Sequence, residues 1–130
     1  MSKKILCIED NNTNLILVSR IVDAEGHDLL SAENGLVALE LLGQETPDLI
    51  LLDINMPGIN GLELAGRIKS DPRLRRIPLI ATTANVLVGD RERCLEAGCD
   101  DYLPKPLDIR KLRELMRVYL AKAETERISP

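Results

Sequence analysis

The chain has 130 residues, which is long enough for one domain with its own hydrophobic core. It contains no Trp or Phe, so that core must be aliphatic, and its net charge of −4 argues against a basic nucleic-acid surface. We therefore expect no direct DNA binding, and no apolar run is long enough to suggest a membrane span.

The three cysteines, Cys7, Cys94 and Cys99, lack the spacing of a metal or redox motif. Cys7 falls in an apolar strand-like run and Cys94 in a helix-like segment, so we interpret them as reduced packing residues. Free thiols of this kind are typical of a cytoplasmic protein.

Strand-like and helix-like segments alternate along the chain. The predicted strands cover residues 4–8, 27–32, 49–52, 79–81 and 101–103. The predicted helices cover residues 14–25, 36–43, 62–70, 86–97 and 109–121. Short apolar strands separated by helices indicate a buried parallel sheet, so this pattern predicts a doubly wound α/β domain. We expect the domain to cover residues 1–121 and a short, frayed tail to cover residues 122–130.

Polar side chains lie where four of the predicted strands end. Glu9 and Asp10 follow the first strand, and Asp53 follows the run at 49–52. Thr83 and Lys105 lie just beyond two later strands. The carboxyl ends of the strands in such a sheet line one crevice, where ligands bind. We therefore expect three acids, a hydroxyl and an amine to meet at one site.

This combination suits phosphoryl chemistry on a carboxylate with a divalent metal. Carboxylates about 5 Å apart repel by roughly 3 kcal/mol per pair at an effective dielectric near 20. A fold would not gather them without a cation, and oxygen ligands favour Mg²⁺, which also accepts phosphate oxygens. Lys105 could pair with Asp53 or with a phosphoryl oxygen.

Each residue also has an ordinary structural explanation. Asp10 could simply favour a helix start, and Lys105 could be a surface residue in a turn. Thr83 could be a strand-forming residue, as we assume for Thr82, but the small Ala84 after Thr83 leaves room for a bound group. Tyr102 could be part of the core or a mobile side chain near the site.

The ordered set of these residues resembles a known family, the response-regulator receiver domains of two-component signalling. The resemblance covers about residues 3–120, and residues 89–103 are similar to stand-alone, single-domain regulators and to receivers of hybrid kinases. The matching residues are Glu9-Asp10, Asp53-Ile54-Asn55-Met56-Pro57, Gly61, Thr83-Ala84, Tyr102 and Lys105-Pro106.

The resemblance implies a five-stranded parallel sheet in the flavodoxin-like order 2-1-3-4-5 with helices on both faces. It implies that Asp53 accepts a phosphoryl group from a histidine kinase or a histidine phosphotransfer protein. Glu9, Asp10, Asp53 and the main-chain carbonyl of Asn55 would hold Mg²⁺, partly through water. Lys105 would contact the phosphoryl group, Thr83 and Tyr102 would shift with it, and the Lys105–Pro106 bond would be cis.

Such a protein is a phosphoacceptor and not an enzyme for a separate substrate, and it signals through contact with a downstream protein or by onward relay. Whether it forms a homodimer stays open. Glu9 stands where the family frequently has Asp, so its metal contact would pass through water, and Leu107 stands where Phe is common.

Three other functions remain as alternatives. A phosphatase with an Asp nucleophile would need an acid two residues after Asp53, where this chain has Asn55. A flavin- or nucleotide-binding module would need a phosphate-binding loop after the first strand, where this chain is acidic. An interaction module independent of phosphorylation is distinguished only by a phosphorylation assay.

Overall fold

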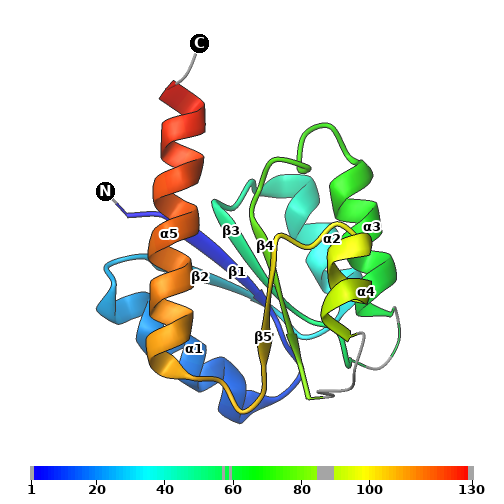
Figure 1. The fold of residues 1–130 in the computed structure, drawn as a ribbon, viewed down its shortest axis with the longest axis horizontal. Coiled ribbons are helices and arrows are strands. Elements are labelled where there is room, and N and C mark those ends of the chain that lie inside the picture. Colours follow the sequence, from blue (N-terminus) through cyan, green and yellow to red (C-terminus); the bar gives the residue numbers. More distant parts are fainter. Residues whose placement is uncertain (1, 57, 59, 85–89, 129–130) are drawn as a thin grey trace.

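A central parallel sheet organises the protein, as the sequence predicts. The computed structural model describes residues 2–56, 58, 60–84 and 90–128. Within these residues the sheet has five strands, all paired in parallel, in the order β2-β1-β3-β4-β5 (Figure 1). The strands are β1 (Lys4–Ile8), β2 (Asp28–Ala32), β3 (Leu49–Asp53), β4 (Leu79–Thr83) and β5 (Asp101–Pro104).

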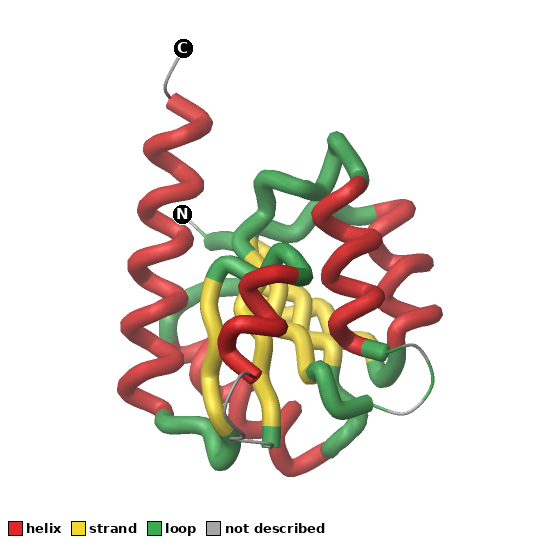
Figure 2. Tube along the Cα trace, turned by 45° about the vertical axis from the view of Figure 1, so that its right-hand side comes forward, coloured by secondary structure: helices red, strands yellow, loops and turns green. Residues whose placement is uncertain are grey.

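Helices cover both faces of the sheet (Figures 1 and 2). They are α1 (Asn12–Ala24), α2 (Gly35–Gln44), α3 (Gly61–Ser70), α4 (Asp90–Glu96) and α5 (Ile109–Ile128). On one face α1 and α5 bury a cluster that includes Val18, Ile21, Val22, Leu112 and Met116. On the other face α2, α3 and α4 bury a cluster that includes Ala38, Leu42, Leu64, Ile68 and Cys94. The predicted aliphatic core is therefore split into two layers by the sheet.

The central strands explain where the polar groups lie. Every residue of β3 and β4 is buried, because helices cover both faces of these strands. The run Leu49 to Leu52 supplies apolar side chains to both faces, so the first position at which β3 carries a charged side chain is its last, Asp53. The apolar run thus places the carboxylate at the edge of the sheet.

The amino ends of the strands are held by a separate group of contacts. The ammonium group of Lys69, on α3, donates to Asp100 Oδ2 at 2.8 Å and to the carbonyl of Ile77 at 2.8 Å. The hydroxyl of Tyr119, on α5, donates to the carbonyl of Asp100 at 3.0 Å. These contacts tie α3 and α5 to the segments that enter β4 and β5, at the end opposite the polar crevice.

Two predicted helix boundaries differ clearly from the structure. The helix expected to end at residue 121 continues to Ile128, so the expectation of a frayed tail from Glu124 is wrong for most of that segment. Residues 122–128 contain no Gly or Pro and are rich in Ala, Lys, Glu and Arg, so nothing in them stops a helix. The first helix begins at Asn12, capped by Asn11.

The start of the fourth helix, predicted at Val86, lies outside the described residues, and α4 is helical over Asp90–Glu96. Among the helices that the structure describes, none combines the length and hydropathy of a membrane span.

Candidate metal centre at the carboxyl end of the sheet

Three carboxylates converge where β1 and β3 end. Glu9, Asp10 and Asp53 each offer an oxygen, and these oxygens all lie within 4.8 Å of one another. Glu9 is 4% exposed and Asp53 is 3% exposed, whereas Asp10 is exposed. The predicted acidic site is thus assembled by two adjacent strands, with one side open to solvent.

Lys105 lies directly against the two buried acids. Its ammonium nitrogen is 3.0 Å from Asp53 Oδ2, 3.0 Å from Glu9 Oε1 and 3.2 Å from Glu9 Oε2. The backbone places it there, because the N–H of Lys105 continues the pairing of β5 with β4 by donating to the carbonyl of Thr83 at 2.7 Å. The Lys105–Pro106 bond is cis, as the resemblance implies.

The surroundings of the site raise the pKa values of Glu9 and Lys105. Burial, together with the neighbouring Asp53 carboxylate, raises the pKa of Glu9 to about 7, although hydrogen bonds from Asn14 and Lys105 oppose that rise. Burial alone would lower the pKa of Lys105, but its contacts with Asp53 and Glu9 outweigh burial and raise it, so Lys105 stays charged. One ammonium group thus balances part of the charge of three acids.

Asn14 is a member of the site that the sequence analysis missed. Its side-chain nitrogen, from the first turn of α1, donates to Glu9 Oε1 at 2.7 Å. Glu9 is thereby held between an amide and an ammonium group. The sequence gives little indication of this role, because Asn14 is one of several asparagines in the segment after β1 and belongs to no recognisable motif.

Asn55 contacts the site through more atoms than the sequence suggests. Its main-chain N–H donates to Asp53 Oδ1 at 2.9 Å. Its side-chain oxygen accepts from the hydroxyl of Thr83 at 2.9 Å and from the N–H of Ala84 at 2.9 Å. The family resemblance implies a role only for the main-chain carbonyl of Asn55, as a metal ligand, and the side-chain link to β4 is additional.

Thr83 and Tyr102 lie at different distances from the acids along their strands. Thr83 is the last residue of β4 and is fully buried. Tyr102 pairs with Ala81 in the middle of the β4–β5 ladder and packs against the core layer that α2, α3 and α4 cover. Thr83 therefore faces the crevice end of the sheet, and Tyr102 lies further from it.

The residues present fit a hard divalent cation. Carboxylate oxygens make up the donor set, and no thiol or imidazole belongs to this group of acids. The charge of the acids exceeds what Lys105 supplies, so a cation would relieve the remaining repulsion. Mg²⁺ keeps several waters, which suits a site with one exposed side.

Fold and site together define a receiver-type domain, a doubly wound parallel sheet with three acids and a lysine at the carboxyl ends of its strands. The chain belongs to the response regulator receiver domain family, whose model matches residues 5–117. It is therefore a phosphoacceptor protein of two-component signalling, a class whose members interact with histidine kinases or histidine phosphotransfer proteins.

Curated relatives match over their whole length. The polar-differentiation response regulator DivK of Brucella anthropi is 40% identical over 123 residues, which cover 95% of this chain and 100% of that protein. The DivK protein of Brucella ovis is 39% identical over 123 residues, which again cover 95% of this chain and 100% of that protein.

Solved structures agree with the fold, and two of the similar structures contain a metal ion. The receiver domain of the sensor histidine kinase PA1611 from Pseudomonas aeruginosa, with a magnesium ion coordinated in its active-site cleft, matches with a TM-score of 0.84 and 32% identity over 93% of this chain and 99% of that one. The Mn(2+)-bound form of response regulator Rcp1 matches with a TM-score of 0.76 and 30% identity, over 89% of this chain and 90% of that one. A CheY-like receiver domain protein from Methanospirillum hungatei matches with a TM-score of 0.88 and 27% identity, over 97% of this chain and 99% of that one.

Proposed function

We propose that Asp53 is the phosphoacceptor of this receiver domain. The observation that carries the proposal is the convergence on its buried carboxylate. One oxygen pairs with Lys105 at 3.0 Å, the other accepts from the N–H of Asn55 at 2.9 Å, and two further acids lie beside it. A carboxylate held in this way is oriented for attack before a donor arrives.

The transfer would proceed from a phosphohistidine of a histidine kinase or a histidine phosphotransfer protein. An oxygen of Asp53 forms a bond to phosphorus while the phosphorus–nitrogen bond breaks, and the imidazole nitrogen keeps the electron pair and takes up a proton. Lys105, released from part of its contact with Asp53, neutralises the new phosphoryl charge. Positioning and charge neutralisation supply most of the catalysis in such transfers.

Mg²⁺ is the proposed cofactor of this step, because it neutralises acids and accepts phosphate oxygens when bound. Glu9, Asp10, Asp53 and the main-chain carbonyl of Asn55 would hold it, with Glu9 acting through water. The chain's own chemistry would be limited to self-phosphorylation and slow self-dephosphorylation.

The output is proposed to be a protein contact or onward relay. The phosphoryl group would hydrogen-bond the Thr83 hydroxyl and bias the surface of α4, β5 and α5, including Tyr102, between two arrangements. A downstream protein would recognise one of them, without direct DNA binding. Three buried cysteines that form no disulfide favour a cytoplasmic location for this exchange.

A small phosphodonor such as acetyl phosphate tests the assignment. With Mg²⁺, intact-mass analysis should show one phosphoryl adduct, which disappears in Asp53→Asn and in the presence of a chelator. The matched control is Asp23→Asn, an exposed acid on α1, which should be modified like the wild type. An adduct that persists in Asp53→Asn would show that another group is the acceptor.

A further inference from the structure

The side chain of Asn55 holds the hydroxyl that the phosphoryl group needs. Asn55 Oδ1 lies 2.9 Å from the Thr83 hydroxyl and 2.9 Å from the N–H of Ala84. A backbone N–H can only donate, so the amide atom facing Ala84 must be the oxygen. The Thr83 hydroxyl, which shares that oxygen, must therefore be the donor of its own contact.

This direction sets up a competition. A threonine hydroxyl carries one proton, and the proton is given to Asn55 in this structure. A phosphoryl oxygen on Asp53 is also an acceptor, so a hydrogen bond from Thr83 to that oxygen withdraws the same proton from Asn55. Asn55 is exposed and its side-chain oxygen keeps the N–H of Ala84 as a donor, so the switch gives up one hydrogen bond without leaving that oxygen unpaired.

Asn55 is also connected to Asp53 itself. Its main-chain N–H donates to Asp53 Oδ1 at 2.9 Å, so one residue contacts both the acceptor carboxylate and the hydroxyl of Thr83. The same side-chain oxygen accepts from the N–H of Ala84, so Asn55 joins Thr83 and the residue that follows β4 at one atom. Movement at Thr83 is therefore coupled to the first residue beyond the strand.

We infer that the Asn55 side chain is a positioning residue that holds Thr83 and Ala84 in the unphosphorylated arrangement and opposes the switch. This inference rests on the proposed function, because it takes Thr83 as the group that responds to the phosphoryl group. Asn55 acts through Thr83 and does not itself take part in the transfer. Its main-chain carbonyl, the proposed metal ligand, is unaffected by side-chain substitution.

The first measurement needs no phosphoryl chemistry. In metal-free protein, Asn55→Ala removes the acceptor, so the Ala84 amide proton should shift upfield and exchange faster with solvent. Asn55→Asp keeps an acceptor oxygen of the same reach, so the Ala84 amide proton should stay protected from exchange and should not shift upfield. Asn34→Ala, which removes the cap of α2, is the control and should leave Ala84 unchanged. An unchanged Ala84 amide in Asn55→Ala would overturn the inference.

The second measurement uses beryllium trifluoride with Mg²⁺ as the phosphoryl probe. Asn55→Ala should bind the probe about three- to tenfold more tightly than the wild type, since one hydrogen bond no longer has to be broken. Its unfolding midpoint without the probe should be equal to or lower than that of the wild type. Tighter binding without greater stability is not expected of a residue that only supports the fold.

A double-mutant cycle isolates the partner. In the Thr83→Ala background, the competing hydroxyl is gone. Asn55→Ala should then increase the affinity for the probe by less than half as much, on a logarithmic scale, as it does in the wild-type background. Equal affinities of wild type and Asn55→Ala would overturn the inference while leaving the proposed function intact. A wild-type protein that does not bind the probe at all would overturn both.

Discussion

The ammonium nitrogen of Lys105 lies 3.0 Å from Oδ2 of Asp53, one of three acids that together could hold a cation. The same nitrogen reaches Glu9 at 3.0 Å, so one lysine occupies the space between the two buried acids. Lys105 therefore supplies, in the absence of metal, part of the neutralisation that a divalent ion would supply. If lysine and metal compete for Asp53, the stability of this domain should depend on divalent ions.

Substitution of Lys105 should make that dependence visible. Lys105→Gln should destabilise the chelator-treated protein by about 3 kcal/mol, because it leaves Asp53 buried without its partner. Millimolar Mg²⁺ should restore much of the loss. Urea unfolding in chelator and in Mg²⁺ measures both values. Lys111→Gln, an exposed lysine on α5, should change neither, and an equal loss in the two variants would show that Lys105 is not specially placed.

Substitution of Asp10 should affect stability differently from substitution of Asp53. Lys105 pairs with Asp53 and with Glu9, whereas no ion pair among the described residues involves Asp10. Asp10→Asn should raise the stability of metal-free protein by up to about 1 kcal/mol, the repulsion of exposed charges at this separation. It should also reduce the thermal shift produced by Mg²⁺.

The control for Asp10 is Asp23→Asn, which removes a negative charge far from the cluster. Melting temperatures in chelator that rise equally for Asp10→Asn and Asp23→Asn would point to net charge and not to local repulsion. A lower melting temperature for Asp10→Asn would contradict the clustering of the acids in solution.

Gly61 should tolerate no side chain. A Cβ there would lie 2.3 Å from the Cα of Ile54 and 3.1 Å from the carbonyl oxygen of Asp53, both backbone atoms that cannot move independently. Gly61→Ala should cost at least 2 to 3 kcal/mol, roughly the range of strong overpacking, and should weaken Mg²⁺ binding by displacing the segment after Asp53.

Gly66 lies five residues further along the same helix and offers the matched comparison. A Cβ at Gly66 would meet nothing within 4 Å. Gly66→Ala should therefore stabilise the protein by about 0.5 to 1 kcal/mol, as expected for glycine in a helix interior. Chemical denaturation of both variants, with Mg²⁺ titrations, distinguishes a steric effect at Gly61 from a general effect of alanine in α3.

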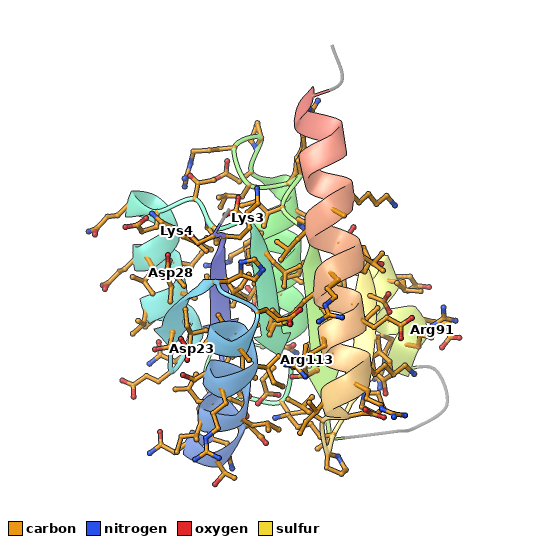
Figure 3. All side chains as sticks on the ribbon, turned by 90° about the vertical axis from the view of Figure 1, so that its left-hand side faces the viewer. Lys3, Lys4, Asp23, Asp28, Arg91 and Arg113 are labelled. Atoms are coloured by element: carbon orange, nitrogen blue, oxygen red, sulfur yellow. The ribbon has the colours of Figure 1, made fainter. Side chains whose placement is uncertain are left out.

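The ion pair between α1 and α5 should show a defined pH dependence. Figure 3 shows these helices side by side, with Arg113 labelled on α5. Hydrogen bonds from the Arg117 guanidinium, at 2.5 and 2.9 Å, lower the pKa of the Glu25 carboxyl. A lowered pKa means that the contribution to stability is complete above the unfolded-state value, about 4.3, and is lost as pH falls through the folded-state value.

Glu25→Gln should therefore be less stable than the wild type at pH 7, and the difference should shrink steadily below a pH of about 4. Urea unfolding at a series of pH values measures the difference, and added salt should reduce it because the pair is at the surface. Glu40→Gln, an exposed acid on α2, should show no comparable difference. A difference for Glu25→Gln that stays constant down to pH 3 would exclude the ion pair as its cause.

Much of this architecture was predictable from the sequence because strand ends are marked by a change from apolar to polar residues. The run Leu49 to Leu52 can be buried on both faces only in a central parallel strand, so Asp53 had to lie at its end. The same reasoning brought Glu9 and Lys105 to the crevice. The family resemblance added the strand order and the cis Lys105–Pro106 bond, both present in the structure.

What the sequence did not reveal depends on side-chain direction. Asn14 and Asn55 are ordinary polar residues by composition, and only their rotamers bring one to Glu9 and the other to Thr83. The end of α5 was misjudged for another reason. Residues 122–128 are mostly charged or small helix formers with no glycine or proline among them, so the composition that suggests a tail also suits a helix.

The unequal exposure of the three acids has a kinetic consequence. Glu9 and Asp53 are 4% and 3% exposed, while Asp10 stands in solvent at the same cluster. An ion can therefore enter and leave past Asp10 without opening of the sheet or its helices. Exchange with bulk should then be limited by the slow dehydration of the ion itself, so Mn²⁺, which sheds water faster than Mg²⁺, should equilibrate sooner at the same concentration.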